Sequence, residues 1–330
     1  MQHDLPELLD ELGDRDLSDP VNASVVLRPD AGRLGVTEEA QMTEATTHTI
    51  DAPGAVLTYD VRSGSDADKT PLLMVASPMA AAGFTTLADH FTDRTVVTYD
   101  PRQSERSRLT SDADPTPETH AEDIHRVIQA AVGSGPVDVL ASSGGAVNML
   151  AFVAAHPDVV RTLVAHEPPL VSALPDREAA FAAIHDVRDT YERDGLGPGM
   201  AKFLGLIMHS GEVPADWTDR PAPDPAQFGL PTEDDGSRED PMLGRGHIVN
   251  TTGYEPDYDA IKAAPTRVVL AYGTESDGLL AQRGAMAVAA ALGVEPTRFP
   301  SDHGGFLGGE YGQTGDPDAF AARLREVLDG

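Results

Sequence analysis

The chain has 330 residues and a formal net charge of −30, because 54 residues are aspartate or glutamate and only 24 are lysine or arginine. Nucleic acids and anionic membranes are disfavoured as partners, since a surface of this charge would repel them. The sequence has no cysteine, which excludes disulfide bonds, a thiolate nucleophile and sulfur ligands for a metal.

The first segment, residues 1–45, is acidic and broken by prolines and glycines, and we interpret it as an N-terminal extension. It has neither the basic segment nor the apolar core of a signal peptide. No apolar run in the chain reaches membrane-spanning length. We therefore expect a cytoplasmic protein.

From residue 46 onward, strand and helix patterns alternate. The β-rich segments 47–50 and 55–61 flank Asp51-Ala52-Pro53-Gly54, which is typical of a hairpin. Apolar runs then predict buried strands, and amphipathic runs predict helices. The strands are expected at 72–76, at 95–99, from residue 137 and at 161–165, with helices at 84–91, at 118–131 and up to 156. This alternation predicts an open, mostly parallel, doubly wound sheet with helices on both faces.

Residues 168–262 depart from this alternation. Helical patterns occur at 177–193, 200–209 and 242–252, and a proline- and aspartate-rich connection between them contains the only tryptophan, Trp217. We interpret this segment as a helical cap inserted over the strand ends, with a substrate pocket that includes Trp217. Strand and helix patterns return at 266–272, 279–292, 297–299 and 318–328. The predicted domains are therefore a core of 46–167 and 263–330, and a cap of 168–262.

The stretch Ala141-Ser142-Ser143-Gly144-Gly145 lies where a buried strand turns directly into a helix. Such a turn needs small residues two positions before and after the residue that it exposes, because the two backbones nearly touch. Centring the turn on Ser143 meets this need, whereas centring it on Ser142 would place a leucine there. The stretch resembles the nucleophile elbow of the α/β-hydrolase superfamily, with one extra methyl group at Ala141. The resemblance implies the α/β-hydrolase fold and Ser143 as the nucleophile; the alternative is a phosphate-binding Ser/Gly loop.

A serine hydroxyl needs a base to accept its proton. Among the 11 histidines, His303 lies in a glycine-rich loop just after the last predicted strand. Asp302-His303-Gly304 resembles the histidine motif of the superfamily, which implies that His303 is the base. The alternative is a solvated loop histidine.

A third group must orient the imidazole, and three carboxylates compete for this role: Glu167, Glu275 and Asp277. The usual superfamily acid follows the penultimate strand, but its spacing from Gly273 falls on Ser276, between two of the candidates. Glu167 directly follows the strand after the elbow, and its strand end is a near neighbour of the others in such a fold.

A narrower resemblance favours Glu167. Ser142-Ser143-Gly144, together with His166-Glu167 before a proline-bearing turn, is similar to the zearalenone (mycotoxin) lactonases of the superfamily. This resemblance implies that Glu167 completes the triad, with Glu275 and Asp277 as the alternatives.

Acyl transfer also needs donors for the developing negative charge. The backbone N–H of Gly144 is one, by its place after the nucleophile. The second is expected in the loop after the 72–76 strand, from Met79, because Pro78 has no N–H. The loop 99–107 resembles the Asp-x-Arg-Gly-x-Gly-x-Ser loop of the superfamily, with Gln103 and Glu105 in place of its glycines.

These residues predict a serine hydrolase that cleaves a carboxylic ester or a lactone through an acyl-enzyme on Ser143, with a zearalenone-type lactone as the narrower expectation. The alternatives are another cofactor-free reaction of this fold (C–C hydrolysis, acyl transfer or perhydrolysis) and a non-catalytic protein that binds a small molecule. We expect no cofactor and no metal site, because His120 and His125 are not at a helical ligand spacing. The expected partner is a small-molecule substrate, and the sequence leaves the oligomeric state open.

Overall fold

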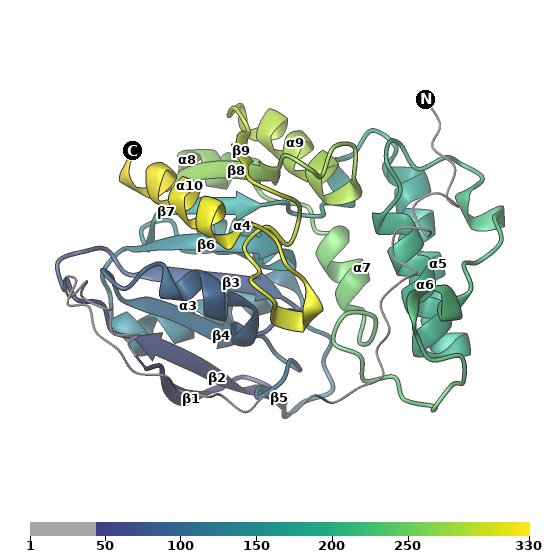
Figure 1. The fold of residues 1–330 in the computed structure, drawn as a ribbon, viewed down its shortest axis with the longest axis horizontal. Coiled ribbons are helices and arrows are strands. Elements are labelled where there is room, and N and C mark those ends of the chain that lie inside the picture. The colour runs from purple at the N-terminus through teal and green to yellow at the C-terminus, as the bar shows by residue number, and fades with distance from the viewer. Residues whose placement is uncertain (1–43) are drawn as a thin grey trace, which may run out of the picture. The chain divides into compact units, whose positions relative to one another are not determined.

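The computed structural model describes residues 44–330 (Figure 1), so the predicted N-terminal extension lies almost wholly outside the described residues. The strands are β1 (Thr46–Ala52), β2 (Ala55–Arg62), β3 (Leu72–Ser77), β4 (Val96–Asp100), β5 (Arg108–Leu109), β6 (Val137–Ser143), β7 (Val160–His166), β8 (Arg267–Gly273) and β9 (Thr297–Phe299).

The α-helices are α2 (Thr85–Asp89), α3 (Pro117–Val132), α4 (Gly144–Ala155), α5 (Arg177–Asp194), α6 (Leu196–Ile207), α7 (His247–Thr252), α8 (Tyr258–Ala263), α9 (Leu280–Leu292) and α10 (Pro317–Asp329). Short 3₁₀ helices are η1 (Ala81–Phe84), η2 (Val171–Ala173), η3 (Trp217–Asp219), η4 (Pro225–Phe228) and η5 (Glu310–Gly312). None of the helices within residues 44–330 is long and apolar enough to cross a bilayer.

All nine strands belong to one sheet, in the order β1-β2-β4-β3-β6-β7-β8-β9, with β5 paired to β2. The first two strands form the predicted hairpin, and β2 also runs antiparallel to β4. From β4 to β9 every pairing is parallel. This confirms the mostly parallel, doubly wound sheet. Because the carboxyl ends of parallel strands share one edge, the loops after β3, β6, β7, β8 and β9 meet there.

The central strand β3 separates two apolar layers, because its side chains point alternately to the two faces. Leu72 and Met74 are buried with side chains of α2 and α10. Leu73 and Val75 are buried on the other face, with side chains of α3, α4, α8 and α9. Helices therefore cover both faces, and the sheet is buried between them.

The connection between β7 and β8 is helical, as the sequence predicts. Helices α5, α6 and α7 enclose an apolar cluster of their own that includes Val187, Leu206 and Ile248. Helix α7 lies between α4 of the core and α5 (Figure 1). Helix α8 packs instead against α4 and α9, and its Ile261 belongs to a core layer of the sheet. The division into core and cap stays a prediction.

Two helices of this segment begin at residues other than those predicted. Helix α6 begins at Leu196, four residues early, and runs through a Gly-Pro-Gly sequence that normally indicates a turn. Gly197 lies so close to the carbonyl oxygen of Pro231 that no side chain fits between them, so this glycine serves packing within a helix. Helix α7 begins at His247, five residues later than predicted, after Gly246 in the left-handed region at φ 65°.

A buried carboxylate joins three elements at the amino-terminal edge of the sheet. Asp138 of β6 is fully buried and accepts hydrogen bonds from Arg161 Nε at 2.8 Å and from Arg94 Nη1 at 3.0 Å. Arg94, just before β4, is itself buried, whereas Arg161 of β7 is about half exposed. Asp138 thereby ties the start of β6 to the segment before β4 and to β7.

Candidate active site

Ser143 ends β6 at a strained turn, with φ 55° and ψ −130°, and α4 begins at the next residue. The close approach expected of this turn is present. A Cβ atom on Gly145 would lie 2.6 Å from the Cα of Ala76, and one on Gly144 would lie 2.6 Å from the carbonyl oxygen of Ser77. The two glycines therefore let α4 start directly against β3, and Ser143 is partly buried at the carboxyl edge of the sheet. Strain of this kind is concentrated at functional sites.

His303 and Glu167 form a hydrogen-bonded pair at the same edge. The Nδ1 atom of His303 lies 2.6 Å from Oε2 of Glu167. The glutamate side chain is 1% exposed and the histidine side chain 44% exposed, so the carboxylate is fixed in the protein while the ring reaches the surface. The other carboxylate oxygen, Oε1, accepts the backbone N–H of Gly273 at 2.9 Å. Glu167 itself has φ 49°, which turns its side chain away from the line of β7.

The surroundings of Glu167 favour its ionised form. Burial alone would raise its pKa, but the hydrogen bond from His303, the two neighbouring imidazoles and the N–H of Gly273 together lower the pKa to about 2. The carboxylate is therefore charged at neutral pH and can hold the imidazole with Nδ1 protonated, which leaves Nε2 free to accept a proton.

Strand order explains how residues distant in sequence meet. β6 pairs with β7, β7 with β8 and β8 with β9, so the loops carrying Ser143, Glu167 and His303 emerge side by side. A buried histidine, His166, bridges them: its Nδ1 lies 3.4 Å from Ser142 Oγ, and its ring centre lies 6.1 Å from that of His303. Within residues 44–330, no hydrogen bond joins His303 to Ser143 Oγ. Such hydrogen bonds are often long before substrate binds.

The two alternative acids lie apart from His303. Glu275 and Asp277 are both exposed. Asp277 accepts a hydrogen bond from Gln282 and lines a hollow of about 380 Å³ beside α9 and β9. Ser276, at the usual spacing of the superfamily acid, is fully buried, and its hydroxyl has no hydrogen-bond partner. The structure pairs His303 with Glu167 and with neither alternative.

The loop after β8 supports the histidine loop through its main chain. The N–H of Thr274 donates to the carbonyl of Phe299 at 3.0 Å, and that of Glu275 donates to the carbonyl of Ser301 at 2.9 Å. The hydroxyl of Thr274 adds a long hydrogen bond to the carbonyl of Ser301, at 3.5 Å, and the side chains of Glu275 and Asp277 take no part in these bonds.

The predicted oxyanion donors, Gly144 and Met79, lie on adjoining loops, because Gly144 packs against the backbone of Ser77. Two contacts hold the loop that carries Met79. Ser104 Oγ donates to the carbonyl of Pro78 at 2.6 Å, and Asp100 accepts the N–H of Ala81 at 3.0 Å. The use of Gly144 and Met79 as donors stays a prediction.

The loop 100–107 adopts a backbone conformation typical of glycine at the two positions where the superfamily motif has glycine. Gln103 and Glu105, which replace the glycines of the superfamily motif, both adopt positive φ, at 65° and 41°. Arg106 donates to Asp100 and to Asp60 of β2, at 2.7 and 2.8 Å. This ion-pair network stabilises the strained turn and so maintains the support for the Met79 loop.

Trp217 lies in η3, with its ring centre 4.8 Å from that of His209 and the guanidinium of Arg220 at 5.0 Å over the ring. Trp217 also packs on the apolar cluster of α5, α6 and α7. A role of Trp217 in the substrate pocket stays a prediction.

Two further residues lie beside the site, and neither was predicted to be catalytic. His166 is fully buried between Ser142 and the His303 ring, and burial lowers its pKa to about 4, so it is neutral at pH 7. Thr251 of α7 lies over the start of α4, with its methyl group 3.2 Å from the place of a Cβ on Gly144. Nothing in the sequence signals Thr251, because its place depends on how α7 folds over the core.

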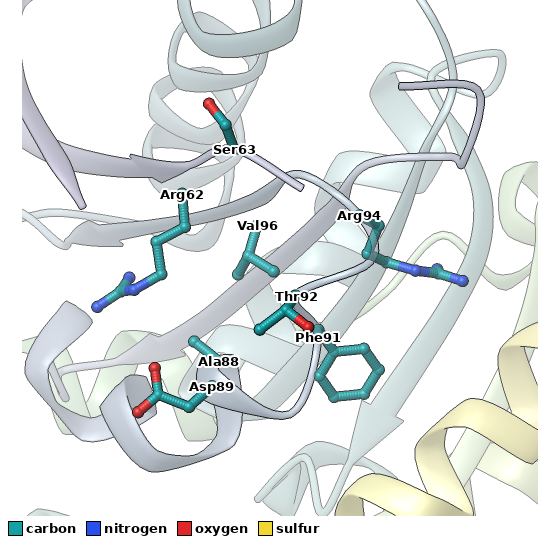
Figure 2. A pocket seen from close by; sticks show the side chains of 8 residues that line it. All are labelled: Arg62, Ser63, Ala88, Asp89, Phe91, Thr92, Arg94 and Val96. Carbon is teal, nitrogen blue, oxygen red and sulfur yellow. The ribbon is translucent and has the colours of Figure 1, made fainter. Parts of the chain in front are cut away.

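A second hollow, of about 10 Å³, has room for one water molecule (Figure 2). It lies beside α2 and the ends of β2 and β4, on the amino-terminal side of the sheet. The residues lining it are Arg62, Ser63, Ala88, Asp89, Phe91, Thr92, Arg94 and Val96. Ligands of such sheets bind at the carboxyl edge, and we assign this hollow no role.

Comparison with known proteins agrees with this fold. A family model described as alpha/beta hydrolase fold matches residues 77–240. An uncharacterized hydrolase of Bacillus subtilis (strain 168), YraK, is 28% identical over 289 residues, which cover 85% of this chain and 95% of that protein.

Two solved structures illustrate the likeness of fold. A thermophilic esterase from Thermogutta terrifontis matches with a TM-score of 0.60 at 15% identity, over 87% of this chain and 98% of that one. A proline iminopeptidase from Mycobacterium smegmatis matches with a TM-score of 0.54 at 18% identity, over 86% and 98%. Because their names give different activities, the shared fold alone does not select a substrate.

Proposed function

We propose that this chain, a hydrolase of the α/β-hydrolase fold, is a serine hydrolase that cleaves a carboxylic ester or a lactone. The observation that carries the proposal is the His303–Glu167 hydrogen bond, at the sheet edge where Ser143 stands at the strained turn. A solvated loop histidine without a catalytic role would not require a hydrogen bond to a buried, ionised carboxylate.

In the proposed reaction, Ser143 Oγ attacks the carbonyl carbon of the substrate while Nε2 of His303 takes the hydroxyl proton. The N–H groups of Gly144 and Met79 stabilise the negative oxygen of the tetrahedral intermediate. The C–O bond to the alcohol then breaks, and His303 gives its proton to the departing oxygen. Water, deprotonated by His303, attacks the acyl-enzyme and releases the carboxylic acid and free Ser143.

The first test is the Ser143→Ala variant. It should lose p-nitrophenyl ester hydrolysis by about a thousandfold or more, because no nucleophile remains, and it should no longer be labelled by a fluorophosphonate probe. Ser142→Ala is the matched control, since it removes the neighbouring hydroxyl and should still be labelled. A folded Ser143→Ala protein with native activity would refute the mechanism. A native protein that resists the probe would favour a small-molecule binding protein.

A zearalenone-type lactone is the narrower proposal for the substrate. It is supported by the position of Glu167 directly after β7, the feature that the sequence shares with the zearalenone lactonases. With a lactone, the alcohol released in the first step stays attached to the acyl group, so the product is a single hydroxy acid. Chromatography of zearalenone after incubation with the enzyme distinguishes the cases: ring opening supports this substrate, and cleavage of simple esters alone removes it.

A further inference from the structure

A cluster of two histidines and a glutamate lies on the outer side of α3, away from the candidate active site. Glu122 and His125 are one turn apart on α3, and His156 is the residue at which α4 ends. One ligand atom from each residue can be chosen so that all three lie within 4.8 Å of one another. It is the one such group of metal-ligand type within residues 44–330.

The contacts within the cluster show that its side chains converge. His156 Nε2 lies 2.9 Å from Glu122 Oε1, and the two imidazoles are stacked with their centres 4.0 Å apart. The buried ring of Phe152 forms an apolar floor, with its centre 5.0 Å from that of His156 and 6.1 Å from that of His125. Imidazole nitrogens and a carboxylate oxygen, the atoms that converge here, are all metal ligands.

We propose that His125, His156 and Glu122 form a binding site for a borderline divalent transition-metal ion, of which Zn²⁺ is the example. Imidazole suits Zn²⁺, Ni²⁺ and Cu²⁺, and a carboxylate completes a three-ligand set that leaves one position for water. Ligand atoms around tetrahedral Zn²⁺ lie about 3.3 Å apart, given bonds of about 2.0 Å. The ligand atoms, all within 4.8 Å of one another, therefore need to approach by at most about 1.5 Å to surround an ion.

The site would connect α3 to the end of α4, because its ligands come from both helices. Helix α4 has 12 residues, so the site stands about 18 Å from its first turn at Ser143. The inference is thus independent of the proposed hydrolase mechanism. No sequence pattern indicates the site, since His156 is 31 residues from His125 and no local spacing pairs them.

The test is titration of the metal-free full-length protein with Zn²⁺ by isothermal calorimetry, with thermal unfolding as a second measurement. We expect one saturable site and an unfolding temperature raised by a few degrees when Zn²⁺ is about a hundredfold above its dissociation constant. Mg²⁺ at equal concentration should give neither effect, because it prefers oxygen ligands. A response to both ions would instead indicate non-specific binding to the acidic surface.

His125→Ala and His156→Ala should each weaken Zn²⁺ binding by at least about tenfold, and His185→Ala, which removes a histidine of α5 outside the cluster, should leave it unchanged. Unfolding without metal checks that each variant is folded; His125→Gln and His156→Gln replace the alanine variants if it is not. Native-like Zn²⁺ affinity in a folded double variant, or no binding by the native protein up to millimolar Zn²⁺, would overturn the proposal.

Discussion

Glu167 has both carboxylate oxygens in use. One accepts the N–H of Gly273 and the other faces Nδ1 of His303. These two contacts fix both the position and the rotation of the carboxylate. The carboxylate in turn orients the imidazole ring of His303. Because the low pKa of Glu167 keeps it charged throughout the neutral range, its ionisation does not limit activity at ordinary pH.

The Glu167→Gln variant tests this pair sharply. The N–H of Gly273 should retain the amide oxygen, so the amide nitrogen would face Nδ1 of His303 and donate to it. The ring would then carry its proton on Nε2 and could not accept one from Ser143. We expect ester hydrolysis to fall by about a hundredfold to ten-thousandfold. Initial rates on a p-nitrophenyl ester provide the measurement.

Glu275→Gln and Asp277→Asn are the matched controls for that experiment, since both residues are exposed and neither contacts His303. Their rates should stay close to native. If either control loses more activity than Glu167→Gln, the orienting carboxylate has been assigned to the wrong strand end.

At the scale of elements, β6 is anchored at both of its ends. Its last residue forms the strained turn, and near its start Asp138 is held by two arginines. A strand that must hold a strained residue in place needs firm support elsewhere, and the buried ion pairs supply part of it.

The Asp138→Asn variant should therefore destabilise the protein strongly. It leaves the buried guanidinium of Arg94 with only the exposed carboxylate of Asp329, at 3.6 Å, as a compensating charge, and loss of a buried partner costs about 3–5 kcal/mol. Arg161→Gln should cost less, because that side chain is half exposed and leaves Asp138 its bond to Arg94. Urea unfolding followed by circular dichroism measures both. A loss below about 1 kcal/mol for Asp138→Asn would mean that the network contributes no more than a surface pair.

The sequence predicted the elements of the core well, because strongly periodic segments carry their own signal. Strands β3 and β7, which flank β6 in the sheet, and helices such as α3 begin and end within a few residues of the predicted bounds. Predictions were poorer between β7 and β8. Gly197 lies inside a helix because Pro231 leaves no room for a side chain, and no local pattern reports a contact with a residue so far along the chain.

The residues of the candidate site also differ in how well the sequence alone predicts them. Ser143 and His303 were predicted as catalytic residues because each belongs to a local motif. The choice of Glu167 over Glu275 and Asp277 could not be made from spacing alone, since it depends on which loop reaches the histidine. In the structure, Glu167 bonds to His303 with its backbone at positive φ. A glutamate at this position in the sequence does not indicate that conformation.

For the whole molecule, buried neutral histidines predict how stability depends on pH. Burial lowers the pKa of His247 to about 4, and burial, together with the nearby His247 and Arg102, holds the pKa of His120 well below its ordinary value. A group with a lowered pKa in the folded state takes up its proton first in the unfolded state. The stability it provides is complete above its ordinary value near 6.5 and is lost as pH falls toward 4.

Replacing His247 by leucine isolates this effect from the change in overall charge. At pH 5 the native histidine should cost on the order of 2 kcal/mol relative to pH 7.5, a loss that His247→Leu does not incur. The unfolding temperature of the variant should therefore fall less steeply between these two pH values. Parallel curves for the two proteins would show that His247 is not buried neutral.

The loop after β8 supports its neighbour chiefly through main-chain bonds, and this has a consequence for how relatives are recognised. The side chains at positions 275 and 277 can be exchanged without loss of these bonds, so an acid is not required at either position. A genome search that demands an acidic residue three places after Gly273 would discard this chain as inactive. A search that also accepts an acid directly after β7 would retain it.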